Sequence, residues 1–275
     1  MKRRNRLIIG TVAILVSVVV FLLPFAFILL QAAKSPAEAA DLSMALPNHW
    51  RFFQNLADVL STHDHVVIRA FVNSAVLTVA SVTIMVLLGA MAGYVIQRRR
   101  SRWNAVANFF VLAGLIVPPA VVPTIWVLQK LHLFKTMPGM ILIEVTYGLS
   151  FCILLVRAFV ATIPREIDEA AALDGAGPLR LFFTIVLPML RPVLITIIVV
   201  HSVAVFNDFA GPLYFLPGDE NATVQLTLFN FQSETLSQYN LLFTDILLIT
   251  IPPLVMYLFF NRRIVAGMTS GALKG

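Results

Sequence analysis

Two acidic residues, Glu144 and Asp245, lie inside long stretches of the chain that otherwise carry no charge. An ionisable side chain at such a position is costly and commonly marks the path of a solute or an ion. Both carboxyl groups are therefore candidates for contact with a solute, although each can instead pair with a cation such as Arg69 or with a partner chain. His201 lies in a third apolar stretch, where a packed and hydrogen-bonded histidine is favoured over a ligand-binding one.

The residue combinations that perform catalysis or bind metal are missing from the sequence. No Ser/His/Asp set, HExxH motif or acidic metal cluster stands out, and the single cysteine, Cys152, excludes an internal disulfide and a multi-cysteine metal site. No GxxxxGKS/T phosphate loop is present, so we do not expect the chain to bind ATP through one. We therefore expect no catalytic and no metal-ligating residues, and the chain is predicted not to be an enzyme.

The composition indicates the kind of element that positions these residues. Of 275 residues, 59% are hydrophobic and 12% are charged, whereas an average soluble domain is about 45–50% apolar and about 25% charged. The mean hydropathy is +0.88. These values exclude a disordered chain and indicate a membrane protein. The net charge of +6 does not indicate nucleic-acid binding, because the basic residues lie in short clusters between apolar runs.

Six stretches are long and uncharged enough to form membrane-spanning helices, which need about 20 apolar residues. We place these spans at 7–30, 70–97, 103–129, 136–156, 192–207 and 241–260. The fifth is short, so it is expected to begin before Arg191. The first is expected to be retained, because its apolar run exceeds the roughly 7–15 residues of a signal-peptide core. Helix breaks are expected at Pro118, Pro119 and Pro123 in the third span and at Pro252 and Pro253 in the sixth.

The distribution of Lys and Arg predicts the orientation of these spans. Fifteen basic residues lie in the two termini and in the segments after the second and fourth spans, and five lie in the alternate segments. Because Lys and Arg are enriched in cytoplasmic loops, both termini are predicted to be cytoplasmic. The fold class is therefore all-α, a polytopic membrane protein with six transmembrane helices.

The cytoplasmic segment between the fourth and fifth spans reads as a short helix followed by a sharp turn. Pro164 suits the first helical turn, where acidic residues also interact favourably with the helix dipole. Gly175 is a natural left-handed cap, Pro178 opens a second helix, and Pro188 limits it. One face of the first helix carries four residues at helical spacing, namely Ile167, Ala170, Ala171 and Asp174. Since a helix that lies on lipid normally carries Lys or Arg with Trp, Phe or Leu, this acidic and alanine-rich helix favours docking to a protein.

The same segment resembles the EAA signature of importer permeases in the ABC transporter superfamily. The resemblance is carried by Glu169-Ala170-Ala171, Asp174-Gly175-Ala176, and Ile185 with Leu187-Pro188. Three other stretches resemble the carbohydrate-importing branch, specifically its MalG-like permease: Asn73-Ser74, Asn207-Asp208-Phe209 with Pro212-Leu213, and the tail from Arg262 to Gly275. The sequence is thus identified as similar to that branch over nearly its whole length.

This resemblance implies a transport subunit in the bacterial cytoplasmic (inner) membrane that is powered by another chain. It implies that the helix is a coupling helix that enters a cleft on a separate ATPase subunit, with contact residues Glu169, Ala170, Ala171, Asp174 and Gly175. It also implies the partners: a second, MalF-like permease subunit, two ATP-binding-cassette ATPase subunits that bind ATP and Mg, and an extracytoplasmic solute-binding protein in addition to the lipid bilayer. The chain itself is expected to hold no cofactor and to bind no nucleic acid.

A single permease domain is expected over residues 1–275, with a peripheral first helix (7–32), a core (68–260) and a coupling loop (162–188). If the solute is a sugar, which proteins hold by hydrogen bonds and aromatic stacking, the candidate contacts are Glu144, Tyr147, Asn207, Asp208 and Tyr214. Asn207 and Asp208 can instead hydrogen-bond the turn that follows the fifth span.

Three alternatives remain open at this point. The solute of such a permease can also be a glycerol phosphate or a polyol. An ion-gradient secondary transporter is a less favoured reading, because it predicts internal repeats and none is visible. The outer loop from Gly211 to Tyr239 either contacts the solute-binding protein or is a solvated loop.

Overall fold

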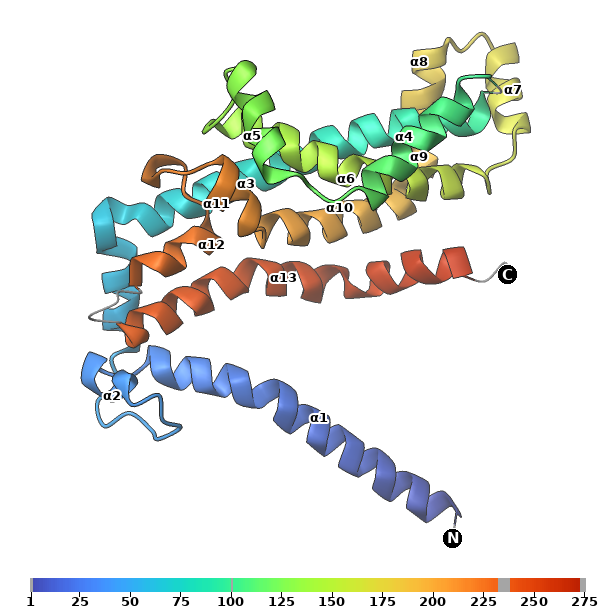
Figure 1. Cartoon of the computed structure of the whole chain (residues 1–275). Helices are drawn as coiled ribbons and strands as arrows, with labels where there is room; N and C mark the ends of the chain where they lie inside the picture. Colours follow the sequence, from blue (N-terminus) through green and yellow to red (C-terminus); the bar gives the residue numbers. More distant parts are fainter. Residues whose placement is uncertain (1, 100, 232–237, 273–275) are drawn as a thin grey trace. The chain divides into compact units, whose positions relative to one another are not determined.

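The computed structural model describes the backbone of residues 2–99, 101–231 and 238–272, and the side chains of most residues between 10 and 260 (Figure 1). Every regular element in these ranges is a helix. The basic residues of the N-terminal tail and the C-terminal tail from Arg262 onward lie outside the part whose side chains are described. The predicted all-helical class is confirmed.

Four single helices are long and apolar enough to cross a membrane. Their spanning parts are Gly10–Ala32 in α1 (Lys2–Ala32), Asp64–Arg98 in α3 (Phe52–Arg98), Met137–Val160 in α6 (Met137–Val160) and Tyr239–Phe260 in α13 (Tyr239–Ala272). Two further spans are bent pairs of shorter helices. The described chain therefore has six candidate spans when each bent pair is counted as one, in the order predicted.

The third span is broken at Pro118 and Pro119, as predicted, but not at Pro123, which lies inside the second of its two helices. Helix α4 (Asn104–Ile116) ends before Pro118, α5 (Val121–Lys130) begins after Pro119, and the two axes differ by 119°. Neither helix alone reaches the roughly 20 residues of a span. A break within a membrane span is tolerated where the unpaired backbone N–H and C=O groups face protein or a water-filled cavity.

The fifth span extends before Arg191, as expected, but it changes direction there by 75°. The part before the bend consists of α8 (Pro178–Arg180), a π-helical turn η1 (Leu181–Val186) and α9 (Leu187–Met189), and the part after it is α10 (Arg191–Phe206). Pro188 lies near the start of α9, so it does not end a helix as predicted. In the sixth span, the predicted break at Pro252 and Pro253 is absent, since α13 continues through both residues. Membrane helices tolerate prolines whose freed carbonyls are satisfied by neighbouring groups.

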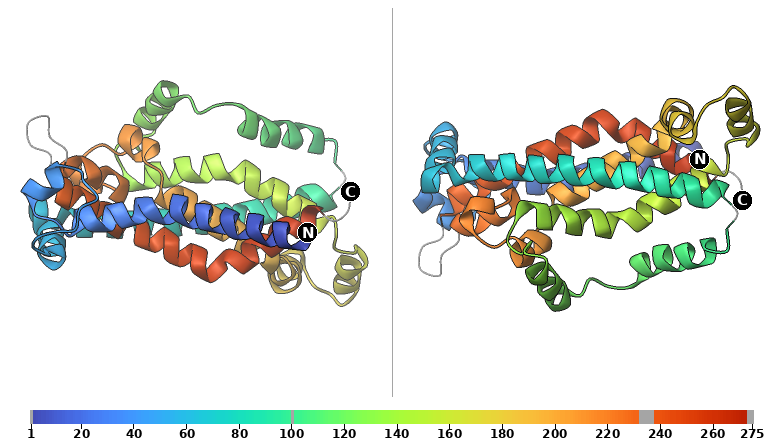
Figure 2. Two further views of the ribbon diagram at one scale, coloured as in Figure 1. Left: turned by 90° about the horizontal axis from the view of Figure 1, so that it is seen from below. Right: turned by 90° about the horizontal axis from the view of Figure 1, so that it is seen from above.

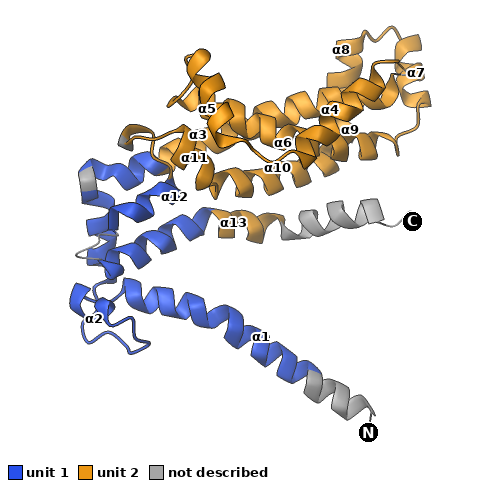
Figure 3. Ribbon diagram, in the orientation of Figure 1, with its two compact units in different colours: residues 1–70, 224–252 blue, residues 71–223, 253–275 orange. Residues whose placement is uncertain are grey.

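The chain divides into two compact units (Figure 3). Unit 1 comprises Met1–Ala70 and Val224–Pro252, and unit 2 comprises Phe71–Thr223 and Pro253–Gly275. Unit 1 thus contains α1, α2 (Pro36–Ala40), α12 (Val224–Thr227), the short η3 (Leu228–Phe231) and the first parts of α3 and α13. The predicted division into a peripheral first helix and a core remains a prediction.

A buried polar network holds unit 1 together. The Asn55 Nδ2 group donates to the carbonyls of Ala32 and Lys34, and Asn240 Nδ2 donates to Asn55 Oδ1 over 2.9 Å. The Lys34 side chain is 1% exposed, and its Nζ donates to the Ser43 carbonyl over 2.6 Å. Buried polar groups need such partners, so this network fixes where α1 ends relative to α3 and α13.

Unit 2 is built on α3 from Phe71 onward, α6 and α10, which run alongside one another in both views of Figure 2. Glycines let α6 approach α3 closely. A Cβ atom at Gly89 would collide with the Cys152 side chain, and one at Gly93 would lie 2.8 Å from Val156. Small residues at helix contacts are the usual way in which membrane helices pack. The result is a tightly packed core that supports the elements at both ends of the helices.

Candidate functional site

The segment between α6 and α10 forms the predicted helix and turn. Helix α7 (Glu166–Leu173) carries three acidic residues in its first turn, where the helix dipole stabilises negative charge. It begins two residues after Pro164, which therefore precedes the helix and does not occupy its first turn. In Figure 1, α7 and α8 lie together at one end of unit 2.

Gly175 ends α7 in the left-handed conformation, as predicted, with a φ of +80°. The Gly175 N–H donates to the Ala172 carbonyl over 3.1 Å, and the Ala176 N–H donates to the Ala171 carbonyl over 3.0 Å. This pair of bonds is the Schellman arrangement that closes a helix at glycine. The turn thereby fixes the direction in which the chain enters α8.

The two sides of α7 have different surroundings. Ile167 packs against the hydrophobic core, and Ala171 is 6% exposed, so both face the chain's own interior. The exposed residues of α7 and its turn are Glu166, Glu169, Ala170, Ala172, Leu173, Asp174 and Gly175. The structure therefore separates the predicted common face: Ala170 and Asp174 point outward, whereas Ile167 and Ala171 do not. Leu173 is 89% exposed, although sequence reasoning did not include it among the contact residues.

Sequence reasoning also missed Arg98, the last residue of α3, which it treated only as an orientation signal. Arg98 Nε lies 2.6 Å from Asp168 Oδ2 on α7, and Nη2 donates to the Ile163 carbonyl over 3.0 Å. A basic residue at the end of a span and an acid in the first turn of the predicted cytoplasmic helix were the available signals. Their pairing depends on packing that brings α3 to α7, which the sequence pattern does not encode.

Three of the predicted pathway residues lie together in unit 2. The Glu144 carboxyl on α6 interacts with the Asp208 carboxyl, which follows α10, and the Tyr147 hydroxyl is close to both groups. Glu144 is 9% exposed, and its Oε1 has no hydrogen-bond partner among the described residues. This cluster thus places a buried acceptor, a second carboxyl group and an aromatic ring next to one another.

Asp208 and Asn207 also make the local contacts that were the alternative to a pathway role. Both oxygens of Asp208 accept from the Gly211 N–H, at 3.2 and 3.1 Å, at the start of α11 (Ala210–Phe215). Asn207 is exposed, and its Nδ2 donates to the Val203 carbonyl over 2.9 Å. Tyr214 is 48% exposed on α11. Asp208 therefore combines a turn-forming contact with a position in the acidic cluster.

Asp245 lies in unit 1, away from any described cation. It is fully buried, and its Oδ2 accepts from the Thr227 hydroxyl over 2.7 Å. Arg69, which was considered as its partner, instead lies 3.7 Å from Asp64. The bond to Thr227 is a structural contact, while Asp245 Oδ1 has no hydrogen-bond partner among the described residues.

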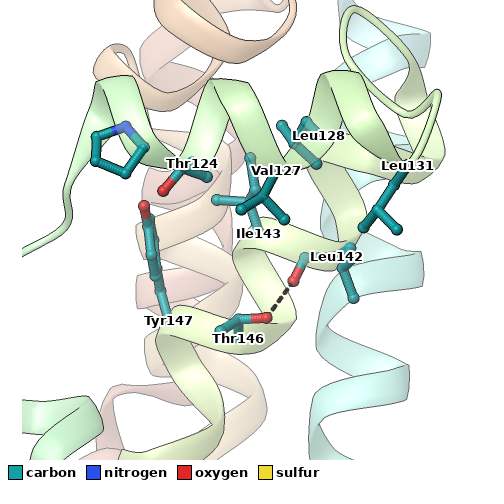
Figure 4. Close-up of a pocket in the computed structure, with 9 residues that line it drawn as sticks. Thr124, Val127, Leu128, Leu131, Leu142, Ile143, Thr146 and Tyr147 are labelled. Atoms are coloured by element: carbon teal, nitrogen blue, oxygen red, sulfur yellow. Dashed lines mark hydrogen bonds between the residues drawn. The ribbon is translucent and has the colours of Figure 1, made fainter.

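A pocket of about 290 Å³ lies between α5 and α6, beside the acidic cluster. Figure 4 shows the Tyr147 hydroxyl, which belongs to a lining residue, pointing toward Thr124. The other lining residues are Pro123, Val127, Leu128, Leu131, Leu142, Ile143 and Thr146. The Thr124 and Thr146 hydroxyls donate to carbonyls of their own helices, at 2.8 and 2.7 Å. The pocket wall is therefore largely apolar, and its polar residues are Thr124, Thr146 and Tyr147.

The outer loop is largely folded in the part that is described. Within unit 2, the Asn73 Nδ2 group donates to the carbonyls of Glu220 and Ala222, at 3.0 and 3.1 Å. Within unit 1, residues 224–231 form α12 and η3. Residues 232–237 lie outside the described part. Residues 211–231 thus hold short helices with both buried and exposed residues, and the role of the loop remains a prediction.

Comparison with known proteins gives a consistent result. Residues 85–270 match the family described as binding-protein-dependent transport system inner membrane component. The chain is 31% identical over 276 residues to the diacetylchitobiose uptake system permease protein NgcG of Streptomyces coelicolor. This alignment covers 99% of this chain and 90% of that protein. It is 30% identical over 210 residues to the melibiose/raffinose/stachyose import permease protein MelC of Bacillus subtilis, with 75% and 76% of the two chains covered.

The fold matches that of a solved transporter. A chain of a bacterial ABC transporter involved in the import of the acidic polysaccharide alginate superposes with a TM-score of 0.83 and 22% identity, over 95% of this chain and 97% of that one. With the family match and the multi-pass helical fold, these findings show that the chain belongs to the inner-membrane components of binding-protein-dependent transport systems, as a permease subunit of an ABC importer.

Proposed function

We propose that this permease subunit forms half of the pathway for an uncharged sugar or oligosaccharide, and that α7 couples transport to ATP hydrolysis by a separate subunit. The relatives named above import diacetylchitobiose and melibiose, raffinose or stachyose, which supports the sugar class. The other half of the pathway is a second, MalF-like permease subunit, and an extracytoplasmic solute-binding protein delivers the sugar.

The acidic cluster is the observation that favours an uncharged, hydroxyl-rich solute. Two carboxyl groups that lie side by side in a buried place share a proton, so this pair carries one negative charge, and its oxygens accept hydrogen bonds. Glu144 and Asp208 therefore suit sugar hydroxyl groups, which donate, and the Tyr147 ring offers a stacking surface. A phosphate ester would meet repulsion from the negative charge of this pair, and the sequence from Pro192 to Asn261 offers no Lys or Arg to pair with it. This argues against a glycerol phosphate and leaves a polyol as the second candidate.

The exposed side of α7 supports the proposed docking of an ATPase subunit. It carries the acids Glu169 and Asp174 beside an exposed leucine, Leu173. A small apolar anchor within a polar rim is typical of a protein contact. With both termini cytoplasmic, as the charge distribution predicts, this face lies on the side of the membrane where ATP is available.

Two measurements test this proposal. The permease should retain an ATP-binding-cassette subunit through purification in mild detergent. Uptake into vesicles that contain the complex and its binding protein should be inhibited by unlabelled disaccharides and not by glycerol 3-phosphate. Inhibition by glycerol 3-phosphate alone would reject the sugar class, and a permease that transports in the absence of any ATPase chain would reject the coupling role.

A further inference from the structure

The Arg98 side chain joins the end of a core helix to the first turn of α7 by three contacts. Its Nε lies 2.6 Å from Asp168 Oδ2, and its Nη2 donates to the carbonyls of Ile163, at 3.0 Å, and Pro164, at 3.3 Å. One guanidinium group therefore fixes both the connection that leaves α6 and the helix that follows it. The rigid fork of arginine is suited to holding several acceptors at once.

The Arg98–Asp168 pair is sheltered from water. The two side chains are 13% and 16% exposed, so solvent and salt screen this pair less than a surface ion pair. Removal of one partner would leave the other charge in a poorly hydrated place, which is strongly unfavourable. The pair is thus able to resist displacement of α7 in a way that an exposed pair is not.

The pair rests on the packed core of unit 2. Tyr94 lies one turn before Arg98 on α3, close to both charges, and its ring packs against Phe182 of η1 with centroids 5.7 Å apart. Phe182 and Ile163 both belong to the buried core cluster. The base of α7 is therefore connected through Arg98 and Tyr94 to α3, a helix that crosses the membrane.

One side of α7 packs against the chain itself, and the other side is exposed to a possible partner. Asp168, Ile167 and Ala171 face the chain itself, whereas Glu169, Leu173 and Asp174 are exposed. A force applied to the exposed side by a docked subunit must reach the membrane helices through the inner side. Among the described residues, the Arg98–Asp168 pair is the ion pair on that side.

We propose that Arg98 is a positioning residue for energy coupling: paired with Asp168, it transmits movement of α7 to α3. This inference rests on the proposed docking of an ATPase subunit to α7. It predicts that breaking the pair leaves the ATPase subunit bound but reduces the solute moved per ATP hydrolysed. A role in folding alone predicts loss of complex with no change in that ratio.

The test is a double-mutant cycle on the complete complex in proteoliposomes, with Arg98→Ala, Asp168→Asn and both changes together. The readouts are the ATPase subunit retained, the rate of ATP hydrolysis, and the solute taken up per ATP. Each single change should lower uptake per ATP about 3- to 30-fold, the range that corresponds to coupling energies of residues in such networks. The double variant should be no worse than the more impaired single variant, because both remove the same contact.

Matched controls are available beside each residue. Arg99→Ala removes an exposed arginine at the same helix end, and Glu166→Gln neutralises an exposed acid in the same turn; both should keep the wild-type ratio. If Arg98→Ala does not fold, Arg98→Lys is tested instead. It keeps the positive charge but lacks the planar guanidinium group, so it should give an intermediate value of solute taken up per ATP. A wild-type ratio in any folded Arg98 or Asp168 variant, or additive losses in the double variant, overturns the inference.

The test separates this inference from the proposed function on which it rests. If the wild-type permease retains no ATPase subunit, the proposed docking fails. If it retains the subunit and Arg98→Ala transports with an unchanged ratio, only the role of Arg98 fails.

Discussion

The carboxyl groups of Glu144 on α6 and Asp208 after α10 lie beside each other in unit 2. These residues are far apart in the sequence, and each has a further neighbour in Tyr147. Glu144 is buried, and one of its oxygens has no hydrogen-bond partner among the described residues, so a solute must displace its neighbours to donate to it. A sugar hydroxyl group is a donor of the kind that this oxygen accepts.

Replacement of Glu144 by glutamine should weaken solute handling without affecting assembly. The change keeps the size of the side chain and replaces one acceptor oxygen by an NH2 group, so a hydrogen bond of about 0.5–1.5 kcal/mol is lost. We expect the KM for uptake to rise about 2- to 12-fold, while ATPase retention stays normal. Asp58→Asn, an exposed acid on α3, is the control. An unchanged KM in a well-assembled Glu144→Gln complex would remove this residue from the pathway.

Replacement of Gly175 by alanine should disturb the turn after α7 by backbone strain alone. A Cβ atom at Gly175 would meet nothing within 4 Å, but the φ of +80° is unfavourable for alanine by about 1–2 kcal/mol. We expect less ATPase subunit to be retained and a lower uptake rate. Asn tolerates this conformation better, so Gly175→Asn should be milder.

Gly177 provides the control for that substitution. Its φ is −67°, and a Cβ atom there also meets nothing within 4 Å. Gly177→Ala should therefore behave as wild type in the retention assay. Equal effects of the two alanine substitutions would show that the left-handed turn has no special role.

Reversal of the charge at Glu169 should release the ATPase subunit. Glu169 is exposed in the first turn of α7, where the helix dipole accounts for about 0.3–1 kcal/mol of the change. Glu166→Lys reverses a charge in the same turn and has the same interaction with the helix dipole. A difference between the two variants therefore measures the contact of Glu169 with the ATPase subunit. Retention of the ATPase subunit should fall with Glu169→Lys and change much less with Glu166→Lys; similar retention in both would contradict the proposed contact.

The pH dependence of stability should reveal the capping role of Glu38 in unit 1. The backbone N–H of Asn48, together with Ser35 and the Asn48 side chain, lowers the pKa of Glu38 from 4.5 to about 2. Because the folded pKa is depressed, the carboxylate stabilises the fold above about pH 4.5, and this contribution is lost as the pH falls toward 2. Thermal unfolding in detergent should show Glu38→Gln to be less stable than wild type at pH 6, with a smaller difference at pH 3. A difference independent of pH would contradict this explanation.

The sequence predicted the elements whose cause is local. Long uncharged stretches predicted the spans. Pro118 and Pro119 predicted the break in the third span, and Gly175 predicted the turn after α7. It was wrong about Pro252 and Pro253, because the surroundings of a membrane helix decide whether a proline breaks it.

Contacts between distant segments were beyond sequence reasoning. The pairing of Arg98 with Asp168, the burial of Lys34 and the inward position of Ala171 all follow from which helices pack together. Helical spacing places Ala170 and Ala171 on adjoining positions, but only the packing against η1 and the core decides which of them stays exposed. The proximity of Glu144 and Asp208 likewise depends on how α6 and α10 pack.

Energy coupling through α7 is the central claim of this account, and one measurement tests it most directly. The purified complex, with its solute-binding protein, is placed in proteoliposomes with ATP on the side of α7, and uptake of a labelled disaccharide is followed with and without ion gradients. We predict uptake that requires ATP, persists without any gradient and stops with a non-hydrolysable analogue. Uptake driven by a proton or sodium gradient without ATP would contradict the account.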